Sequence, residues 1–471
     1  MRIKALIVAA ATGVAIASVP AAADATPASG ARMQTWLAGH LASVSRATVL
    51  VHGTSTAAAT RAARASGLKV LTTWDAIDVA VASGSRAQIR SVAERPGVTY
   101  LEGDQPLTYA LATSNVATRG DAARRTLEGA DGRALDGRGV SVAVLDTGVD
   151  GTHPMLTEAD GSSAVVRNMK SICNAVVNLG PACFLDVPTN DSDTVSLGGH
   201  GTHVAGIVAG RDVTVDGTAM HGAAPGAKVV ALSIGTAISI LDSVNGFDWV
   251  LQNHARPCGA DVSAAECPPI KVISNSWGPA GGGDFDPQDA IVQFQRQLAA
   301  QGVVTVWANG NDGGDGSANL SNPPGQDPTP GIISVAAYDD QGTGTRSGTV
   351  AEFSSRGNNG TVSTYPDISA PGVDILSSCR LTLPVCLTAT APGDYVELSG
   401  TSMATPHISG IVAQLFQRAP GATPGQIEDA LKATAHKYSN GAPYQTAGPY
   451  TTSFDKGTGL ADVVAAANHL G

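Results

Sequence analysis

The sequence is poor in aromatic and charged residues. Aromatic residues make up only 4% of the 471 positions and charged residues 15%, whereas hydrophobic residues make up 43%. A disordered chain would be rich in charge and poor in apolar residues, so this composition indicates a folded protein. With so few aromatic rings, the core has to be built mainly from Ala, Val, Ile and Leu. The 55 glycines follow no Gly-X-Y period, which excludes a collagen-like fibre and indicates many tight turns.

An excess of positive charge is also absent. Lys and Arg number 29, Asp and Glu number 40, and the formal net charge is −11. Proteins that bind nucleic acids present a basic face, so we expect no nucleic-acid partner. No later stretch reaches the ~18 uninterrupted apolar residues of a membrane-spanning helix. At about 150 residues per domain, the length predicts two to four domains.

Residues 1–25 have the composition of a secretory signal peptide. Two basic residues stand near its start, an apolar stretch spans 5–19, and small residues close the segment. This order is typical of a cleaved signal rather than of a membrane anchor, because the apolar stretch is short and Gly13 interrupts it. We therefore expect a secreted, extracellular protein with no membrane attachment once the signal is removed.

The six cysteines are consistent with an exported protein. They fall in three close pairs, and none of them has the C-x₂₋₄-C spacing that a zinc site would need. Six cysteines allow 15 pairings, and the sequence alone does not select one. Local disulfides that close short loops are the favoured scheme, namely Cys173–Cys183, Cys258–Cys267 and Cys379–Cys386.

Two architectures follow each other along the chain. After a short helical pattern at 33–44, residues 45–105 alternate in the order β-α-β-β-α-β, the ferredoxin-like pattern, with Ser85 placed to cap the second helix. Residues 106–118 are predicted to be a linker. From Gly139 onward, short apolar strands alternate with helices, which predicts an α/β domain with a mainly parallel sheet covered by helices on both faces. The expected strands include 140–145, 229–233, 272–274 and 303–307, and the expected helices include 200–210 and 289–301.

Three segments bring together a carboxylate, a base and a nucleophile. SVAVLDTGVD delivers Asp146 at the end of a buried strand, GHGTHVAG contains His200, and GTSMATP contains Ser402 at the start of a helix. In that helix Thr401 is expected to be the cap and Pro406 to lie in the first turn. A serine hydroxyl needs an adjacent base to take its proton and a carboxylate to orient that base. The helix dipole also favours negative charge near Ser402.

Together and in this order, the three segments resemble the subtilisin-like serine proteases, the subtilases. The resemblance covers 119–471 as the peptidase domain and 45–105 as the family's ferredoxin-like propeptide, with the processing site in 106–118. It implies a secreted serine endopeptidase that hydrolyses peptide bonds through an acyl-enzyme. It also implies a zymogen that cleaves off its own propeptide, which acts as an intramolecular inhibitor. We expect a monomer with protein or peptide substrates.

The resemblance also implies a role for each catalytic residue. Ser402 attacks the peptide carbonyl, His200 moves the proton, and Asp146 orients His200. Asp150 is the alternative carboxylate, but it lies past the end of the predicted strand. The oxyanion would be bound by the side chain of Asn311 and the backbone N–H of Ser402.

Asn309 is the alternative to Asn311, which is preferred because Gly310 precedes it, as the family pattern requires. The segment NSWG at 275–278 resembles the family's substrate-binding edge, which would bind an extended peptide by β-augmentation. Trp277 and Trp307 could line the cleft or fill the core, and the sequence favours neither. The expected substrate-binding residues are Ser276, Trp277, Gly278, Ala308 and Gly310.

Calcium is common in the family. Met155 stands where a calcium-ligating Asp would fall in the family. The acidic run in 157–198 could offer the hard oxygens that calcium prefers, although such runs are more often solvated loops. We therefore expect no metal ligands and no cofactor for the chemistry. His203 is expected to be a core residue, because there is no H-E-x-x-H motif. The calcium alternative rests on Asp186, Asn190, Asp191 and Asp193.

Three other functional classes are less consistent with these residues. A non-catalytic peptide-binding protein of this fold would be expected to lack a member of the triad, and all three are present. A serine-carboxyl peptidase of related fold would have Glu in place of His200. An esterase of the α/β-hydrolase type would need G-x-S-x-G and the order Ser…Asp…His.

Overall fold

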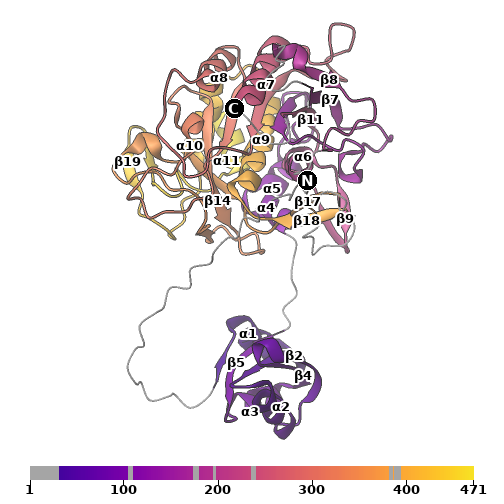
Figure 1. The fold of residues 1–471 in the computed structure, drawn as a ribbon, viewed down its shortest axis with the longest axis vertical. Coiled ribbons are helices and arrows are strands. Elements are labelled where there is room, and N and C mark those ends of the chain that lie inside the picture. Colours follow the sequence, from indigo (N-terminus) through magenta and orange to yellow (C-terminus); the bar gives the residue numbers. More distant parts are fainter. Residues whose placement is uncertain are drawn as a thin grey trace, which may run out of the picture. The chain divides into compact units, whose positions relative to one another are not determined.

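The chain forms two compact units, residues 1–107 and 108–471, each described here by itself (Figure 1). In this computed structural model, the expected signal peptide 1–25 lies outside the described residues. Among the described residues, no helix combines the length and hydropathy needed to cross a membrane. The structure describes residues 31–103, 110–172, 180–194, 198–234, 240–380, 386 and 394–471.

The first unit contains the predicted ferredoxin-like fold. Its sheet has the strand order β1-β5-β2-β4-β3, and four of these strands with two helices follow the expected β-α-β-β-α-β sequence. Ser85 is the N-cap of α3, as the sequence predicted. Its side chain accepts from the N–H of Gln88, and the Gln88 side chain accepts from the N–H of Ser85, which completes a capping box. The elements are β1 (Arg32–Met33), α1 (Thr35–Ser43), β2 (Arg46–Gly53), α2 (Thr56–Ala65), β3 (Lys69–Trp74), β4 (Val79–Ser85), α3 (Arg86–Ala93) and β5 (Val98–Gly103).

This unit begins earlier than the expected boundary at residue 45. Strand β1 pairs in parallel with β5. Helix α1 buries Leu37 and Leu41, both 0% exposed, in the same core as the strands and helices that follow. The short helical pattern at 33–44 was visible in the sequence, but only the packing of its apolar side chains assigns it to this unit.

The second unit is built on a mainly parallel sheet with the order β15-β14-β13-β12-β6-β11-β7-β8, in which β16 also pairs with β14. The pairs β14–β15 and β7–β8 are antiparallel, and the other pairs are parallel. Its strands are β6 (Ser141–Asp146), β7 (Val165–Ser171), β8 (Phe184–Asp186), β11 (Lys228–Ser233), β12 (Ile270–Asn275), β13 (Val304–Ala308), β14 (Ile332–Asp339), β15 (Thr349–Val350) and β16 (Ile368–Pro371).

Helices and three small hairpins surround this sheet. The hairpins pair β9 with β10, β17 with β18, and β19 with β20. Their strands are β9 (Val213–Val215), β10 (Thr218–Met220), β17 (Ile375–Ser378), β18 (Tyr395–Leu398), β19 (Gln445–Ala447) and β20 (Tyr450–Thr452). The helices are α4 (Ala110–Ala117), α5 (Gly120–Thr126), α6 (His200–Ala209), α7 (Ile240–Asn253), α8 (Ala290–Ala300), α9 (Thr401–Arg418), α10 (Pro424–Thr434) and α11 (Val463–His469).

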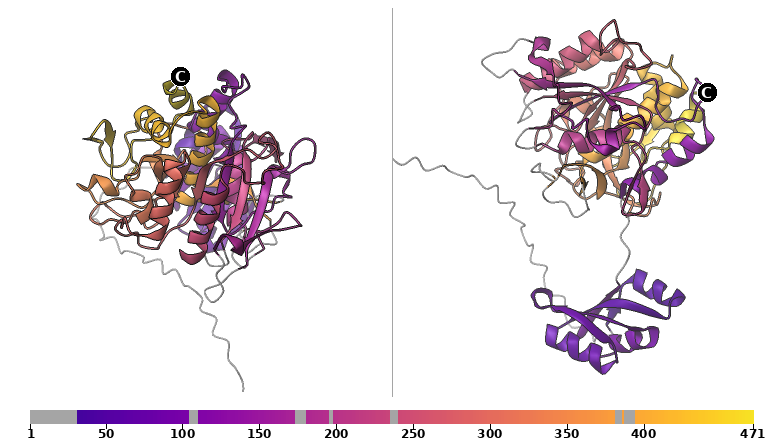
Figure 2. Two further views of the ribbon diagram at one scale, coloured as in Figure 1. Left: turned by 90° about the horizontal axis from the view of Figure 1, so that it is seen from above. Right: turned by 90° about the vertical axis from the view of Figure 1, so that its right-hand side faces the viewer.

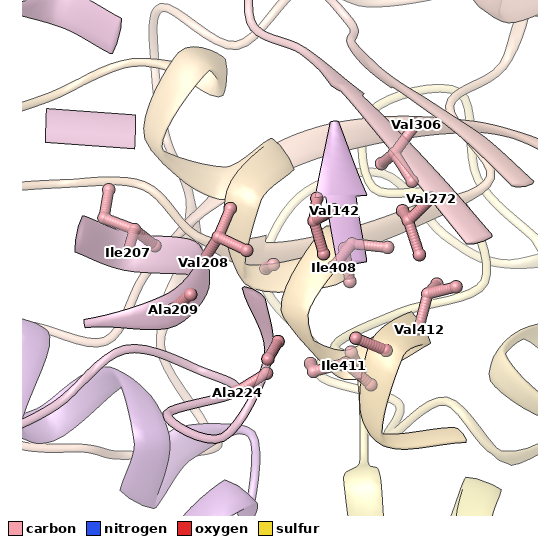
Figure 3. Close-up of a cluster of buried hydrophobic side chains, with 14 of the residues drawn as sticks. Val142, Ile207, Val208, Ala209, Ala224, Val272, Val306, Ile408, Ile411 and Val412 are labelled. Carbon is pink, nitrogen blue, oxygen red and sulfur yellow. The ribbon is translucent and has the colours of Figure 1, made fainter. Parts of the chain in front are cut away.

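The central strands are buried on both faces, so successive residues enter two different cores. Along β6, Val142 and Val144 pack with helices α6 and α9, whereas Ala143 and Leu145 pack with α7 and α8. Helices therefore cover both faces of the sheet, as the sequence predicted (Figure 2). Figure 3 shows part of the first core, which includes Val142, Ile207, Val208, Val272, Val306, Ile408, Ile411 and Val412.

Most of the expected linker 106–118 belongs to the second unit. Helix α4 covers 110–117, and Ala117 is buried against Tyr338, Tyr438 and Leu460. The backbone carbonyl of Thr118 accepts from the N–H of Val463 at 2.9 Å. The small and polar composition of this segment suggested a linker, but small side chains also allow close packing against a folded surface.

Candidate active site

The three residues of the expected triad lie on elements that end or begin at one edge of the large sheet. Asp146 is the last residue of β6, His200 is the first residue of α6, and Ser402 is the second residue of α9. Helices α6 and α9 pack against each other over the same face of the sheet. Parallel strands end together, and this carboxyl edge is where open α/β sheets bind their ligands.

Asp146 and His200 are joined by a hydrogen bond. Nδ1 of His200 lies 2.8 Å from Oδ1 of Asp146, which also accepts the N–H of Thr147 at 2.7 Å. Burial opposes the charged form of His200, but the charge and hydrogen bond of Asp146 and the charge of Asp193 outweigh it and raise the pKa of His200 above 6.5. Because Nδ1 faces Asp146, Nε2 is left for a reacting group.

Ser402 is held against the segment that follows β12. Its hydroxyl donates to the backbone carbonyl of Ser276 at 2.9 Å, and the hydroxyl of Ser276 donates to the carbonyl of Ser402 at 2.8 Å. Among the described residues, Ser276 rather than His200 is therefore the partner of the Ser402 hydroxyl. Rotation about the Cα–Cβ bond would redirect this hydroxyl, and catalytic hydrogen bonds in unliganded enzymes are often formed only with substrate.

The start of α9 differs from the prediction. Gly400 is the N-cap, Thr401 is already helical, and Pro406 lies inside the helix rather than in its first turn. Proline has no N–H, so it cannot donate to the carbonyl four residues earlier, which is that of Ser402. That carbonyl is instead the acceptor for Ser276. The proline thus frees the group that ties the nucleophile to the neighbouring strand end.

Asn311 has one end of its amide fixed and the other available. Its Oδ1 accepts both the N–H and the hydroxyl of Thr401 at 2.9 Å. A Cβ placed on Gly400 would lie 3.5 Å from Nδ2 of Asn311 and 3.5 Å from the backbone N of Ser402. The two nitrogen atoms thus lie close to each other beside the nucleophile, and an oxyanion site needs two such donors.

Asn309 has partners at both ends of its amide. It is 0% exposed, its Nδ2 donates to the carbonyl of Ser355 at 2.7 Å, and its Oδ1 accepts the hydroxyl of Ser334 at 2.7 Å. Its side chain therefore joins two neighbouring segments of the core.

The alternative carboxylate, Asp150, has partners other than the base. It accepts the N–H and hydroxyl of Thr152 and forms an ion pair with Arg380. His203, expected in the core, is 0% exposed and contacts the carbonyl of Val396 at 3.0 Å. Burial lowers its pKa to about 3, so it is neutral in the folded protein.

The expected substrate-binding edge at 276–278 is partly open. Gly278 is exposed, and among the described residues its peptide groups have no hydrogen-bond partner. The indole N–H of Trp277 donates to the carbonyl of Leu145 at 2.9 Å, so this side chain faces inward. Trp307 is 0% exposed and stacks on Phe247, which places it in the core.

The other two expected substrate-binding residues are occupied within the protein. Ala308 is buried, and its carbonyl accepts from Nδ2 of Asn322 at 2.9 Å. The N–H of Gly310 donates to Thr401, and its carbonyl accepts from Ser355. Gly310 has φ +111°, and a Cβ there would meet the Ser355 hydroxyl at 2.6 Å, so this position requires glycine.

Asn322 was not identified from the sequence. Its Nδ2 donates to the carbonyls of both Trp277 and Ala308 at 2.9 Å, so it ties together the two segments expected to bind substrate. It stands 45 residues after Trp277 and 14 after Ala308, in a loop of Ser, Asn and Pro that is typical of any turn. No local signal distinguishes it.

Two of the three expected disulfides are present, Cys258–Cys267 and Cys379–Cys386. The third pairing, Cys173–Cys183, includes a residue outside the described part of the chain, so it stays a prediction. Residues 379 and 386 are both 0% exposed, and they close a loop that follows β17. Just before this loop, the hydroxyls of Ser377 and Ser378 donate to backbone carbonyls of α6.

The acidic run considered for calcium does not converge on one point. Asp186 pairs with Arg167, Asp191 faces Arg380, and Asn190 donates to the carbonyl of Gly151. Met155 is fully buried in the hydrophobic core. Within the described ranges, no group of three or more His, Cys, Asp or Glu side chains is arranged to hold a metal ion.

The sequence is similar to one large group of known proteins. The sequence profile described as "Subtilase family" matches residues 137–459. Serine protease AprX of Bacillus subtilis (strain 168) is 31% identical over 323 residues, which cover 66% of this chain and 65% of AprX. Fervidolysin of Fervidobacterium pennivorans is 34% identical over 318 residues, covering 66% of this chain and 39% of fervidolysin. The chain thus spans less than two thirds of the length of either.

Longer matches reach into the first unit. Subtilisin E of Bacillus subtilis (strain 168) is 28% identical over 411 residues, which cover 85% of this chain and 84% of subtilisin E. Among solved structures, the crystal structure of fervidolysin, "a keratinolytic enzyme related to subtilisin", covers 90% of this chain and 61% of that chain. Its TM-score is 0.50 at 25% identity.

Proposed function

The chain belongs to the subtilase family of serine peptidases, and we propose that it is a secreted endopeptidase made as a precursor that removes its own N-terminal unit. The observation that carries this proposal is the 2.8 Å hydrogen bond between His200 and Asp146 at the edge where Ser402 begins α9. Subtilases need no cofactor for catalysis.

The residues of this site can perform acyl transfer. The Ser402 hydroxyl turns from the Ser276 carbonyl toward Nε2 of His200, which takes its proton as Ser402 attacks the peptide carbonyl. Asp146 holds Nδ1 and stabilises the imidazolium that forms. His200 then gives the proton to the amine as the peptide C–N bond breaks. Water, deprotonated by His200, attacks the acyl-enzyme, and His200 returns the proton to the Ser402 oxygen as its ester bond breaks.

Two donors beside Ser402 support the assignment of the oxyanion site. Nδ2 of Asn311 and the backbone N–H of Ser402 flank the same point, and the amide of Asn311 is oriented by its two hydrogen bonds from Thr401. Donors that are fixed before the reaction cost no reorganisation when negative charge develops on the carbonyl oxygen.

The open edge of Gly278 supports binding of an extended peptide. Its peptide groups lack partners among the described residues, and an extended substrate could pair with them in the manner of an added strand. This geometry recognises backbone and is consistent with protein substrates in general. The side chain of Trp307 is buried and does not belong to this surface, whereas Trp277 is half-buried with its indole N–H directed inward.

We further propose that the self-cleavage falls within residues 104–109. Strand β5 ends the first unit at Gly103, and α4 begins the second at Ala110. Buried residues of α4, such as Ser114 and Ala117, would have to leave the fold for a cut inside this helix. Because the first unit is tethered, its cleavage in cis and its later inhibition would benefit from a high effective concentration.

Secretion is supported by the composition of residues 1–25 and by two disulfides, which persist in oxidising compartments. A monomer is sufficient for the proposed chemistry, because the triad and Asn311 all belong to one chain.

Substitution of the nucleophile tests this proposal. The variant Ser402→Ala is expected to accumulate as the uncut precursor, whereas the wild-type protein should begin within 104–110 when its N-terminus is sequenced. A serine-directed phosphonate should label the wild type but not Ser402→Ala. The control is Ser399→Ala, which should still be labelled, because in the wild type the Ser399 hydroxyl binds Asp374 at the surface. Full peptidase activity in Ser402→Ala would contradict the proposed function.

A further inference from the structure

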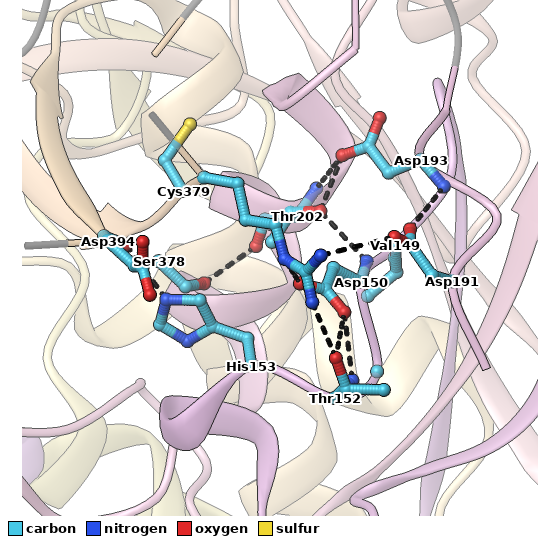
Figure 4. A network of polar contacts seen from close by, with 12 residues as sticks. Val149, Asp150, Thr152, His153, Asp191, Asp193, Thr202, Ser378, Cys379 and Asp394 are labelled. Carbon is cyan, nitrogen blue, oxygen red and sulfur yellow. Dashed lines mark hydrogen bonds and ion pairs between the residues drawn. The ribbon is translucent and has the colours of Figure 1, made fainter. Parts of the chain in front are cut away.

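A second buried carboxylate contacts both elements that hold the Asp146–His200 pair. Asp193 is 0% exposed. Its Oδ1 accepts the hydroxyl of Thr147 at 3.0 Å and the N–H of Gly199 at 2.9 Å. Its Oδ2 accepts the N–H and hydroxyl of Thr202 at 3.2 and 2.5 Å, the contact drawn in Figure 4. No step of the acyl transfer described above uses this group.

These donors come from the two catalytic elements. Thr147 follows Asp146 at the end of β6, while Gly199 and Thr202 flank His200 at the start of α6. The side-chain oxygen of Thr147 also accepts the N–H of Gly201, at 3.0 Å. Asp193 therefore joins the strand that ends in the carboxylate to the helix that begins with the base.

Helix α6 needs an acceptor at its first turn from elsewhere. Its N-cap is Gly199, which has φ +100° and no side chain to accept the first helical N–H groups. Asp193 accepts the N–H of Thr202, and Thr147 accepts that of Gly201. A negative charge at a helix N-terminus also interacts favourably with the helix dipole.

We propose that Asp193 is a positioning residue for His200. Asp193 keeps the imidazole of His200 in hydrogen-bonding position against Asp146, and its negative charge favours the imidazolium formed during catalysis. Its four hydrogen bonds all come from neutral donors, so its charge is not cancelled by a direct ion pair. It does not contact His200 or any reacting atom, and it acts through Thr147, Gly199 and Thr202. This inference rests on the proposed peptidase function.

The other charged groups around Asp193 are already engaged. Asp150 pairs with Arg380, and Asp191 accepts the N–H of Asp193 at 3.1 Å and faces the same arginine (Figure 4). On β7, the ammonium of Lys170 contacts the hydroxyl of Thr194. Asp146 and Asp193 are thus the two carboxylates whose charge raises the pKa of His200 against burial.

The protonation state of Asp193 matches this role at neutral pH. Burial raises its pKa to about 6, and the nearby charge of Asp146 acts in the same direction, while its hydrogen bonds oppose the rise. At pH 7 the carboxylate of Asp193 is therefore largely charged. This is also the pH range in which His200 must be neutral so that it can accept a proton.

The substitution Asp193→Asn tests this inference. The new amide keeps the size of the side chain, but its NH₂ must face either Gly199 N–H or the N–H of Thr202, so one donor loses its acceptor. Full-length variants would be matured and active-site titrated with a phosphonate, and kcat and KM measured on a peptide between about pH 5 and 9. We expect kcat to fall about 10–100-fold with KM nearly unchanged, because small misplacements of a base are costly.

The acid limb of the pH profile, meaning the fall of kcat/KM at low pH as His200 is protonated, distinguishes an effect of Asp193 on His200 from a general loss of stability. Loss of the negative charge lowers the pKa of His200, so the limb should move to lower pH in Asp193→Asn. Glu158→Gln is the matched control, since Glu158 is a carboxylate bound to Arg211 and Lys228 outside the His200 network. It should lower Tm and leave the limb where it is in the wild type.

An acid limb at the wild-type pH in Asp193→Asn, whatever its Tm, would overturn the inference. If this variant matures too slowly for steady-state assays, the pH dependence of its residual rate of precursor cleavage in cis gives the same readout. An inactive Ser402→Ala combined with an unmoved limb in Asp193→Asn would refute the role of Asp193 alone and leave the proposed function intact.

Discussion

Removal of the Asn311 side chain tests the oxyanion site most directly. Its Oδ1 is held by Thr401, and its Nδ2, which has no partner among the described residues, lies close to the backbone N of Ser402. Loss of one oxyanion donor, as measured in the relative subtilisin, lowers kcat by about 10²–10³, or about 3–4 kcal/mol of transition-state stabilisation. We expect Asn311→Ala to lose kcat in this range with a smaller change in KM.

The same substitution removes an acceptor at the start of α9. The N–H and hydroxyl of Thr401 lose their partner, which costs about 1 kcal/mol of stability, the usual value for a helix cap. Asn311→Asp keeps that acceptor and replaces the donor by an anion that repels the oxyanion. It should therefore lose at least as much kcat as Asn311→Ala while retaining Tm.

Asn309→Ala is the matched control, because Asn309 is an asparagine two positions away with a different task. Its removal leaves the buried carbonyl of Ser355 and hydroxyl of Ser334 without partners, which should cost about 2–4 kcal/mol in the free energy of unfolding. Its kcat per active site should stay within a few-fold of the wild type.

The assay combines active-site titration, steady-state kinetics on a peptide ester and amide, and thermal unfolding of each variant. We expect Asn311→Ala to show mainly a loss of kcat and Asn309→Ala to show mainly a loss of thermal stability. A larger fall in kcat for Asn309→Ala than for Asn311→Ala, both folded, would refute the assignment.

Two further predictions concern stability. Each observed disulfide closes a short loop, with sequence separations of 9 and 7. Replacing either pair by alanine should therefore lower the free energy of unfolding by roughly 2–3 kcal/mol. Non-reducing peptide mapping should recover each loop as one linked peptide, and a peptide joining different pairs would contradict the local scheme. Burial opposes ionisation of Glu158, but Arg211 and Lys228 outweigh it and lower its pKa to about 2. The charge of Glu158 therefore stabilises the folded protein fully above its ordinary pKa of 4.5, and this stabilisation is lost as the pH falls toward 2. The Tm difference between wild type and Glu158→Gln should shrink over that pH range. A constant difference would show that the charge of Glu158 does not contribute to stability.

The sequence determined the fold class because local and periodic signals agreed. Apolar runs such as 142–145 and 229–232 are buried on both faces, and such runs are typical of parallel strands between layers of helices. The order of the three motifs also determined which residues to seek for catalysis, since Asp146, His200 and Ser402 each occupy an element end that the sequence marks with glycine. The capping signal at Ser85 was strong enough to locate the start of α3 to the residue.

Packing between distant segments decided the rest. Whether 31–44 and 110–118 belong to a unit depends on where Leu37, Leu41 and Ala117 find a core, and local composition does not encode that partner. In the same way, Asn311 and Asn309 are nearly equivalent in sequence. Only their hydrogen bonds, to Thr401 at one and to Ser355 and Ser334 at the other, distinguish a free donor from a buried crosslink.

The roles of Asp193 and Asn322 likewise depend on tertiary structure. An aspartate in an acidic loop and an asparagine before two prolines have the composition of ordinary turns. Their partners lie on the ends of strands and on a helix start that approach only when the parallel sheet forms, because such a sheet brings the carboxyl ends of its strands to one edge. Sequence therefore determined the main strands and helices of the large sheet, whereas the tertiary fold decided which side chains meet at its edge.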